Sequence, residues 1–200
     1  MTTRLFRFIV AALTATLVAC AARTDGTLVR SIDEFEMATR QLAPGDKIVL
    51  ADGVWRDVEL ELRARGTAES PVHLTAQTPG GVVISGESNL SISGEYIVVS
   101  DLVFRDGYTP TSEVISFRTS KSELAKHSRV TNTVIDSFSN PERHSSDTWV
   151  AIYGRENRID HNTLVNKGNR GVTLAEKMNT EARHENGHIN ERNYFGPRQP

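Results

Sequence analysis

The sequence predicts an all-β solenoid, in which short parallel strands stack coil upon coil beneath a single capping α-helix at the N-terminal end. Three observations predict it: only one helical pattern, a long series of short strands bounded by turn residues, and an Asn-containing segment that recurs about every 30 residues. The composition, 38% hydrophobic and 24% charged, is that of one soluble globular domain. A net charge of -2 provides no basic excess for binding phosphates, which argues against nucleic acid as a partner.

The first residues have the features of an export signal. Arg4 and Arg7 precede an apolar stretch, residues 8–19, that is too short to span a bilayer as a helix. The stretch ends in Leu-Val-Ala before Cys20, the only cysteine, and this order resembles a bacterial lipobox. We therefore expect residues 1–19 to be a lipoprotein signal peptide and Cys20 to be lipidated, which would anchor the protein to a membrane. Cleavage after Ala22, as in an ordinary signal peptide, is the alternative.

A tether and a helix are expected next. Residues 20–30 form the predicted tether, and the coil domain is expected to span residues 31–200. Ser31 and Glu34 fit a capping box, and apolar residues follow at helical spacing up to Leu42, which predicts a helix of roughly three turns. The Pro-Gly pair at residues 44–45 should end it.

The remainder of the chain consists of predicted strands. They are expected at residues 48–50, 58–62, 72–75, 82–84, 90–92, 97–99, 102–104, 114–117, 130–135, 150–153, 158–165 and 171–174. An antiparallel sandwich also uses many short strands, but its hairpins usually need two-residue loops between long alternating strands. Strands of only about three to five residues favour the solenoid.

The repeat supports the same conclusion. Segments 129–135 (RVTNTVI), 158–164 (RIDHNTL) and 188–195 (HINERNYF) each place an Asn between apolar residues. In a coil such an Asn can adopt a left-handed backbone at a corner, and stacked Asn side chains can bond to each other. The alternative is that Asn merely marks loops.

Several segments resemble a known family. Residues 42–55 (LAPGDKIVLADGVW) look like the start of the pectin-lyase-like right-handed parallel β-helices. Further segments are similar to polysaccharide lyase family 6, whose members cleave alginate or dermatan sulfate and include chondroitinase B. These segments are residues 66–72 (GTAESPV), 76–80 (AQTPG), 83–90 (VISGESNL), 104–110 (FRDGYTP), 167–172 (KGNRGV) and 193–197 (NYFGP). The resemblance covers about residues 30–200.

The catalytic motifs of that family are missing here. The resemblance implies Ca²⁺ bound by an Asn in an Asn-Gly-Gly-Glu run and by two Glu on a later strand. It also implies a Lys base in an Asn-Lys-Ser run and an Arg on a further coil. Neither run occurs in this sequence, so no catalytic or metal-binding residue is carried over, and these residues are expected beyond Pro200. We expect a β-helix truncated at its C-terminal end, which binds no Ca²⁺ and is inactive alone.

Substrate-binding residues are expected in the last third of the chain. Residues 141–200 hold nine Lys or Arg against eight Asp or Glu, and four of the six histidines. Lys167, Arg170 and Lys177 cluster within one coil, and Arg143 and His144 lie on a polar loop that could border the same groove. These residues are predicted to pair with uronate carboxylates. A merely solvated coil face and loop are the alternatives.

Two other possibilities carry less weight. His184 and His188 are four residues apart, which would suit zinc on a helix, but the segment has no apolar stripe and no evident third ligand. Trp55 and Trp149 could stack on sugars, although Trp55 fits a core position better.

The leading hypothesis is therefore an exported, lipid-anchored polysaccharide lyase of the cell envelope. Its substrate would be an acidic polysaccharide, with alginate favoured over dermatan sulfate, cleaved by β-elimination. The alternative hypothesis is a non-catalytic β-helix lipoprotein that binds glycans or serves a structural role.

Overall fold

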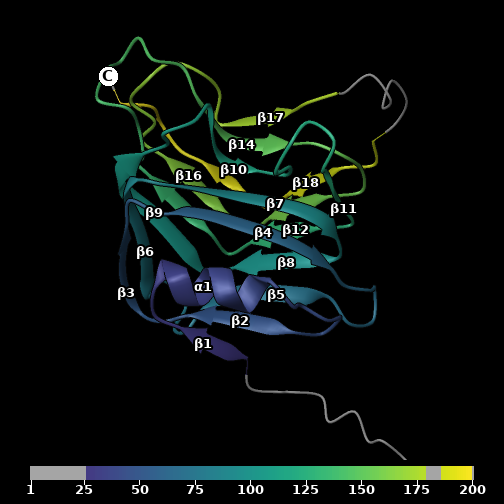
Figure 1. The fold of residues 1–200 in the computed structure, drawn as a ribbon. Coiled ribbons are helices and arrows are strands. Elements are labelled where there is room, and N and C mark those ends of the chain that lie inside the picture. Colours follow the sequence, from purple (N-terminus) through teal and green to yellow (C-terminus); the bar gives the residue numbers. More distant parts are fainter. Residues whose placement is uncertain (1–25, 179–185, 200) are drawn as a thin grey trace, which may run out of the picture.

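The computed structural model describes residues 26–178 and 186–199 and forms a parallel β-helix of three sheets (Figure 1). Sheet A has the order β1 (Thr27–Val29), β2 (Lys47–Leu50), β5 (Val72–Ala76), β8 (Ile97–Ser100), β12 (Arg129–Thr131), β15 (Arg158–Asp160) and β18 (Ile189–Glu191). Sheet B has the order β3 (Gly53–Arg56), β6 (Val82–Glu87), β9 (Leu102–Tyr108), β13 (Val134–Asp136), β16 (Thr163–Val165) and β19 (Tyr194–Phe195). Sheet C joins β11 (Ala125–Lys126), β7 (Asn89–Glu95), β10 (Glu113–Ser116), β14 (Thr148–Ile152) and β17 (Leu174–Glu176), and β4 (Glu59–Arg65) also pairs with β7.

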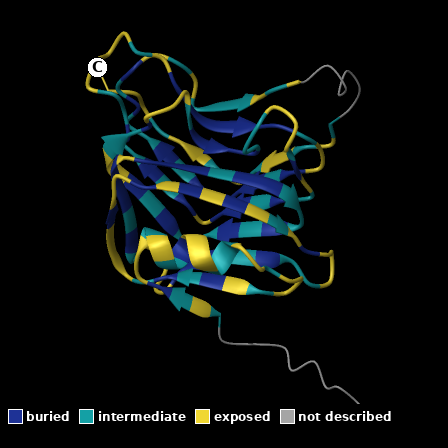
Figure 2. Ribbon diagram, viewed as in Figure 1, coloured by how far each residue is buried: buried dark blue, intermediate teal, exposed yellow. Residues whose placement is uncertain are grey.

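The named strands pair in parallel, and the chain passes through sheets A, B and C in turn, with β10 and β11 of one coil both in sheet C. This arrangement confirms the predicted solenoid. In sheet A, one inward column places Ile48, Leu74, Val99, Val130 and Ile159 in register. These partners are 25 to 31 positions apart and are all buried, so each coil completes its core against its neighbours (Figure 2).

Helix α1 (Ile32–Thr39) covers the first coils and buries Phe35 against the core (Figure 1). The Ser31 hydroxyl accepts from the Glu34 N–H at 3.2 Å, as expected, while the Glu34 carboxylate accepts from the N–H of Arg30. The helix is shorter than the predicted three turns. It ends at Thr39, and Leu42 packs on the core from outside the helix.

The predicted C-terminal boundary of the tether, residue 30, is wrong. Residues 27–29 form β1, which pairs with β2, so the coil domain has already begun at Thr27 rather than at Ser31. The sheet provides backbone partners that a tether would lack, and sequence pattern alone does not reveal such an edge strand. Cys20 and the predicted signal peptide lie outside the described residues. Within the described parts, no helix is both long and apolar enough to cross a membrane.

The far boundary of the predicted coil domain also falls outside the described part of the chain. The last residue that the structure describes is Gln199, and Pro200 lies outside the described residues. The expectation that the catalytic residues lie beyond Pro200 therefore stays a prediction.

Two predicted strands are each divided at a corner. Asn132 and His161 have φ of 50° and 55°, and they separate β12 from β13 and β15 from β16. In the next two coils the Asn of the repeat bonds to the preceding coil instead. The Asn162 side-chain oxygen accepts from the Thr133 N–H at 2.9 Å, and the Asn193 side-chain oxygen accepts from the Asn162 N–H at 2.9 Å. The Asn162 amide also donates to the Asn193 side chain at 3.0 Å. The Asn residues of the repeat therefore have two roles: Asn132 forms a left-handed corner, and Asn162 and Asn193 form a ladder of hydrogen bonds between coils.

The connections at the corners of the solenoid differ in length. Between sheets A and B, most connections have one or two residues. Between sheets B and C, eleven residues separate β13 from β14 and eight separate β16 from β17. We call residues 137–147 the first connection and residues 166–173 the second connection. They lie in consecutive coils at the same corner of the solenoid and carry most of the predicted site residues.

Candidate functional site

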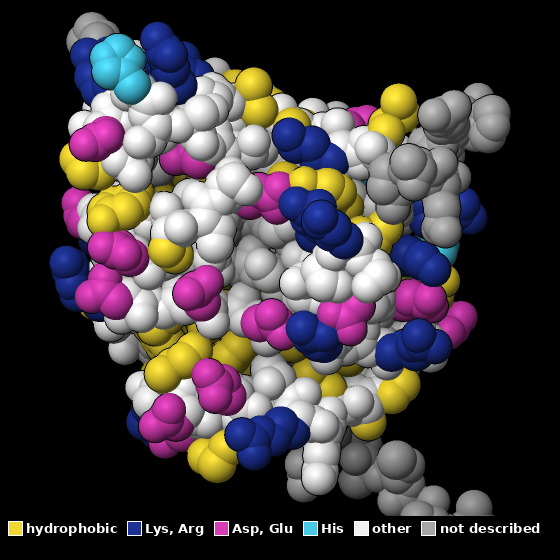
Figure 3. Space-filling model, turned by 45° about the horizontal axis from the view of Figure 1, so that its top comes forward, with side chains coloured by type: hydrophobic (Ala, Val, Ile, Leu, Met, Phe, Trp, Pro, Cys, Tyr) yellow, Lys and Arg dark blue, Asp and Glu magenta, His cyan; other side chains and the backbone are white. Residues whose placement is uncertain are grey.

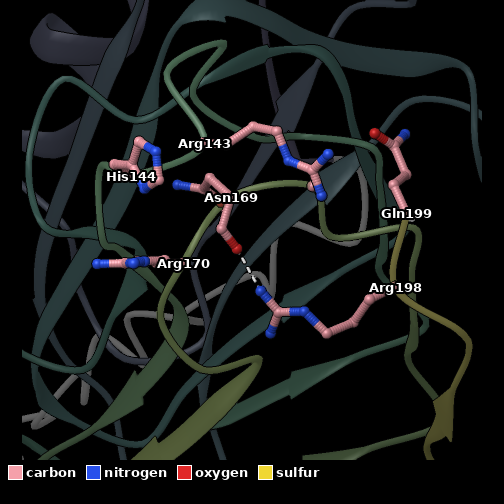
Figure 4. Close-up of a pocket in the computed structure, with 7 residues that line it drawn as sticks. Arg143, His144, Asn169, Arg170, Arg198 and Gln199 are labelled. Atoms are coloured by element: carbon pink, nitrogen blue, oxygen red, sulfur yellow. Dashed lines mark hydrogen bonds between the residues drawn. The ribbon is translucent and has the colours of Figure 1, made fainter.

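The two connections and the last described residues enclose a hollow of about 490 Å³ (Figure 4). It is lined by Arg143, His144, Gly168, Asn169, Arg170, Arg198 and Gln199. Figure 3 shows basic side chains and a histidine gathered at the corner where Figure 1 places the C-terminal end. Arg143, His144 and Arg170, predicted from the sequence, are thus brought together.

The hollow carries positive charge without a compensating carboxylate. Three guanidinium groups and an imidazole line it, and none of its described lining residues is Asp or Glu. Arg198 donates to two backbone carbonyl oxygens, those of Asn169 and Gly171. In Figure 4 the guanidinium groups of Arg143 and Arg198 extend toward each other across the hollow, while that of Arg170 points outward from its edge. Such a surface can bind anions by charge-assisted hydrogen bonds.

Backbone bonds fix the two connections to each other. The Arg170 N–H donates to the Arg143 carbonyl at 3.1 Å, and the Asp147 N–H donates to the Arg170 carbonyl at 3.3 Å. The C-terminal segment joins them, because Gln199 donates its N–H to the Lys167 carbonyl at 3.2 Å. The lining residues therefore belong to a continuous hydrogen-bonded surface of stacked coils.

Lys167 was predicted to contact substrate, but the structure places its side chain inside the protein. The residue is 2% exposed, and its ammonium group is paired with the Asp147 carboxylate. The ammonium also donates to the Asn169 side-chain oxygen at 2.8 Å and lies 5.2 Å from the centre of the Trp149 ring. Burial lowers the pKa of Lys167, against the opposing effect of its hydrogen bond to Asp147. In this arrangement Lys167 is satisfied internally and does not line the hollow.

Lys177 is not brought to the hollow. It is half-buried just after β17, where its N–H donates to the Ile152 carbonyl at 2.8 Å. The chain between Arg170 and Lys177 contains β17 and so crosses sheet C, which places Lys177 at another corner of the coil. The predicted cluster is therefore divided: Lys167 is buried, Arg170 lies at the edge of the hollow, and Lys177 lies away from it.

The tryptophans are structural. Trp55 is buried, as its position in the sequence suggested, and its indole N–H donates to the Ala51 carbonyl at 3.0 Å. Trp149 is also fully buried and donates to the Phe138 carbonyl at 2.7 Å. Neither ring is available to stack on a sugar.

The histidine pair whose spacing would suit zinc is only partly within the described residues. His188 Nδ1 accepts from the Asn157 N–H at 3.2 Å, which uses this nitrogen in a corner ladder, while His184 lies outside the described residues. In residues 26–178 and 186–199, no group of three or more His, Cys, Asp or Glu side chains is arranged to hold a metal ion. We therefore assign no described residue to the calcium ligand set that the family resemblance implies.

A second hollow of about 560 Å³ lies between α1 and sheet C. Four cations line it, Arg40, Arg63, Arg65 and Lys126, together with the carboxylates of Glu95 and Glu123. Arg63 contacts Glu123, and Lys126 lies 3.9 Å from Glu95. Because carboxylates are part of its lining, this hollow is a weaker anion site than the first one, although it is larger.

Sequence reasoning missed Arg198, Asn169 and Asp147. Arg198 lies one coil beyond Lys167, 31 residues later, so the coil period could have located it. Asp147 could not be found in this way, because its role depends on a contact with a lysine 20 residues away across two connections.

Comparison with known proteins places these features in a family. A family model described as chondroitinase B matches residues 29–200. No curated protein matched the chain.

Solved structures agree. An alginate lyase of polysaccharide lyase family 6, AlyGC, is 52% identical with a TM-score of 0.84, and the match covers 86% of this chain and 24% of that one. A mannuronic acid specific family 6 lyase from human gut microbiota is 34% identical with a TM-score of 0.74, covering 80% of this chain and 37% of that one. The family 6 lyase Pedsa3628 from Pseudopedobacter saltans, at 24% identity and a TM-score of 0.73, supports the fold. The described coils match the N-terminal part of right-handed parallel β-helices, and the chain spans about a quarter to a third of those relatives' length.

Proposed function

Because the chain belongs to the chondroitinase B family, we propose that its basic hollow is a carboxylate-binding subsite of a lyase that cleaves alginate by β-elimination. The observation that carries the proposal is the convergence of three arginines and a histidine on one hollow that no described carboxylate lines. An alginate chain carries a carboxylate on every sugar, so adjacent cations suit it.

The chemistry explains what these residues contribute. β-Elimination from a 1,4-linked uronate removes the proton on C5, next to the carboxylate, and expels the oxygen on C4. That proton is weakly acidic because the neighbouring carboxylate is already negative. The planar guanidinium groups of Arg143 and Arg198 can bind carboxylates in a bidentate way and hold successive sugars in a fixed orientation. Binding energy at such subsites can be used to position the reacting sugar.

The catalytic groups are a separate matter. The family resemblance implies Ca²⁺, a Lys base and an Arg near the leaving group in the longer proteins. Neither the Asn-Gly-Gly-Glu run nor the Asn-Lys-Ser run occurs in the sequence, so we assign no step to the ion and no catalytic residue to this chain. What the described coils do is bind and orient.

Alginate is favoured over dermatan sulfate by the relatives. Two solved structures more than 30% identical are titled as an alginate lyase and as a mannuronic acid specific lyase. The same hollow would also serve a protein that binds glycans without cleaving them. These alternatives differ in product: only a lyase generates the unsaturated uronate that absorbs in the ultraviolet.

The proposal includes export and a lipid anchor at Cys20. Its support is the sequence alone: an apolar stretch that ends in Leu-Val-Ala before the single cysteine. Labelling with radioactive palmitate in the source bacterium should mark the protein, and Cys20→Ser should abolish the label. Persistent label in that variant would show that Cys20 is not the lipidation site.

Binding to the hollow can be tested directly. We expect the chain to bind a mannuronate tetrasaccharide in calorimetry, with weaker binding at higher salt. Arg143→Ala together with Arg170→Ala should weaken binding by about tenfold or more, since each charge-assisted bond is worth about 1–3 kcal/mol before solvent screening. Arg105→Ala is the matched control: this exposed arginine lies on β9 and does not line the hollow. Equal affinity of the double variant and the control would contradict the proposed site.

A further inference from the structure

We propose that Lys167, Asp147 and Asn169 form a buried positioning ring that holds the two connections, and with them Arg143, His144 and Arg170, in the geometry that binds substrate. This inference rests on the proposed function for its substrate, but its structural part can be tested independently. It assigns Lys167 a role behind the binding surface instead of a contact with the polysaccharide.

The ring is closed and almost dry. Lys167 pairs with one Asp147 oxygen and donates to the Asn169 side chain, and the Asn169 amide donates to the other Asp147 oxygen at 2.6 Å. Lys167 is 2% exposed, Asp147 is 6% exposed and Asn169 is 1% exposed. Each side chain thus uses the other two, and the indole of Trp149 lies beneath the ammonium group.

The ring joins two different coils. Asp147 ends the first connection, whereas Lys167 and Asn169 belong to the second connection, about 20 residues further on. Asn169 also donates to the Ser145 carbonyl at 3.1 Å, next to His144. Gly168, Asn169 and Arg170 directly follow the lysine and themselves line the hollow. Any shift in the ring would therefore move the surface that carries the cations.

An apolar cluster could hold the same space at no loss in stability. Buried ion pairs recover little more than the cost of removing two charges from water, and replacing them by apolar residues of similar size is often neutral or stabilising. Burial lowers the pKa of Lys167, which is consistent with that cost. What an apolar cluster lacks is direction, because hydrogen bonds fix the relative orientation of two loops and dispersion contacts do not.

The experiment separates positioning from stability. The double variant Lys167→Met with Asp147→Leu replaces the pair by apolar side chains of similar size. We expect its melting temperature to fall by only a few degrees, because the Asn169 side-chain oxygen loses its donor while the Asn169 amide keeps the Ser145 carbonyl. We expect its affinity for the mannuronate tetrasaccharide to fall by about tenfold, and exchange of the Arg170 amide hydrogen to accelerate by about tenfold or more. Amides of β13 and β16 should keep their protection. Lys126→Gln with Glu95→Gln, which removes an exposed pair far along sheet C, is the control for the loss of one charge of each sign.

The outcomes are distinct. Unchanged protection of the Arg170 amide in the double variant overturns the inference, whatever happens to binding. Lost protection with undiminished tetrasaccharide affinity also overturns it, because the ring would then fix the loops without shaping the site. If the unaltered chain does not bind the tetrasaccharide while the double variant loses protection, the proposed function fails and the loop-positioning role stands. If the double variant fails to fold, Lys167→Arg, which retains the charge, should keep the fold and alter Arg170 exchange and affinity together; a change in neither refutes positioning.

Discussion

Replacing Asn162 by alanine should reveal how much the stacked asparagine ladder contributes to the solenoid. The side chain is 4% exposed and makes three hydrogen bonds across coils. Its oxygen accepts from the Thr133 N–H at 2.9 Å, and its amide donates to the Val130 carbonyl at 3.1 Å and to the Asn193 side chain at 3.0 Å. Asn162→Ala removes all three and leaves Thr133, itself buried, without this partner for its N–H.

The size of the effect follows from those contacts. An unsatisfied buried backbone group costs about 1–3 kcal/mol, and the lost bonds to Val130 and Asn193 add to it, so we expect a total of about 2–4 kcal/mol. For a domain of this size each kcal/mol lowers the melting temperature by about 2–4 °C, which gives a fall of roughly 5–15 °C.

Urea unfolding followed by circular dichroism measures this free energy. Asn140→Ala is the matched control, because Asn140 is half-buried in the first connection and its side chain accepts one bond, from the Glu142 N–H at 2.9 Å. The control should lose no more than about 0.5–1 kcal/mol. A loss below about 1 kcal/mol for Asn162→Ala, or one equal to the control, would refute the argument that cross-coil bonds of this ladder support the fold.

Three further predictions follow from the structure. Burial raises the pKa of Asp160, but its hydrogen bonds with Arg129 and His161 and the nearby guanidinium charges outweigh this, so its pKa lies below the ordinary 3.8. The carboxylate therefore contributes stability above about pH 4 that is lost as the pH falls below it, and Asp160→Asn should flatten that part of the stability curve. The purified chain should release no unsaturated uronate from alginate with or without Ca²⁺, and turnover abolished by Lys167→Ala would show that its site is misassigned. The chain should self-associate through the strand edges of β18 and β19, where Tyr194 is 60% and Phe195 47% exposed, and a monodisperse monomer in light scattering would count against this.

The fold was predictable because its signals are local and repeated. Short strands between turn residues, the cap at Ser31 and the recurring Asn each depend on neighbouring residues or on a simple period. The split of the predicted strand at 130–135 was not predictable from the apolar pattern, because that pattern does not show that a single left-handed residue, Asn132, ends β12. Strand β1 was missed because it is held by pairing with β2 rather than by its own pattern.

The site was predictable only in part. Arg143, His144 and Arg170 were found because polar loops in the last third of the chain carry exposed cations. Lys167 looked like another of them, because sequence does not show which way a side chain points in an irregular connection. Its inward direction is set by Asp147, a partner in another coil, and such non-local pairs are visible only once the coils are stacked.

The uneven corners of the solenoid have a consequence for how binding sites of this kind diversify. Short connections between sheets A and B, pinned by left-handed residues such as Asn132 and His161, keep successive coils in step. The first and second connections, with eleven and eight residues, are longer, and most residues that line the basic hollow belong to them. An insertion there alters the wall that faces a polymer, while the strands beneath keep their register. The glycan that is bound can therefore change while the solenoid beneath stays the same. Loops of successive coils along this edge would contact successive sugars of the polymer.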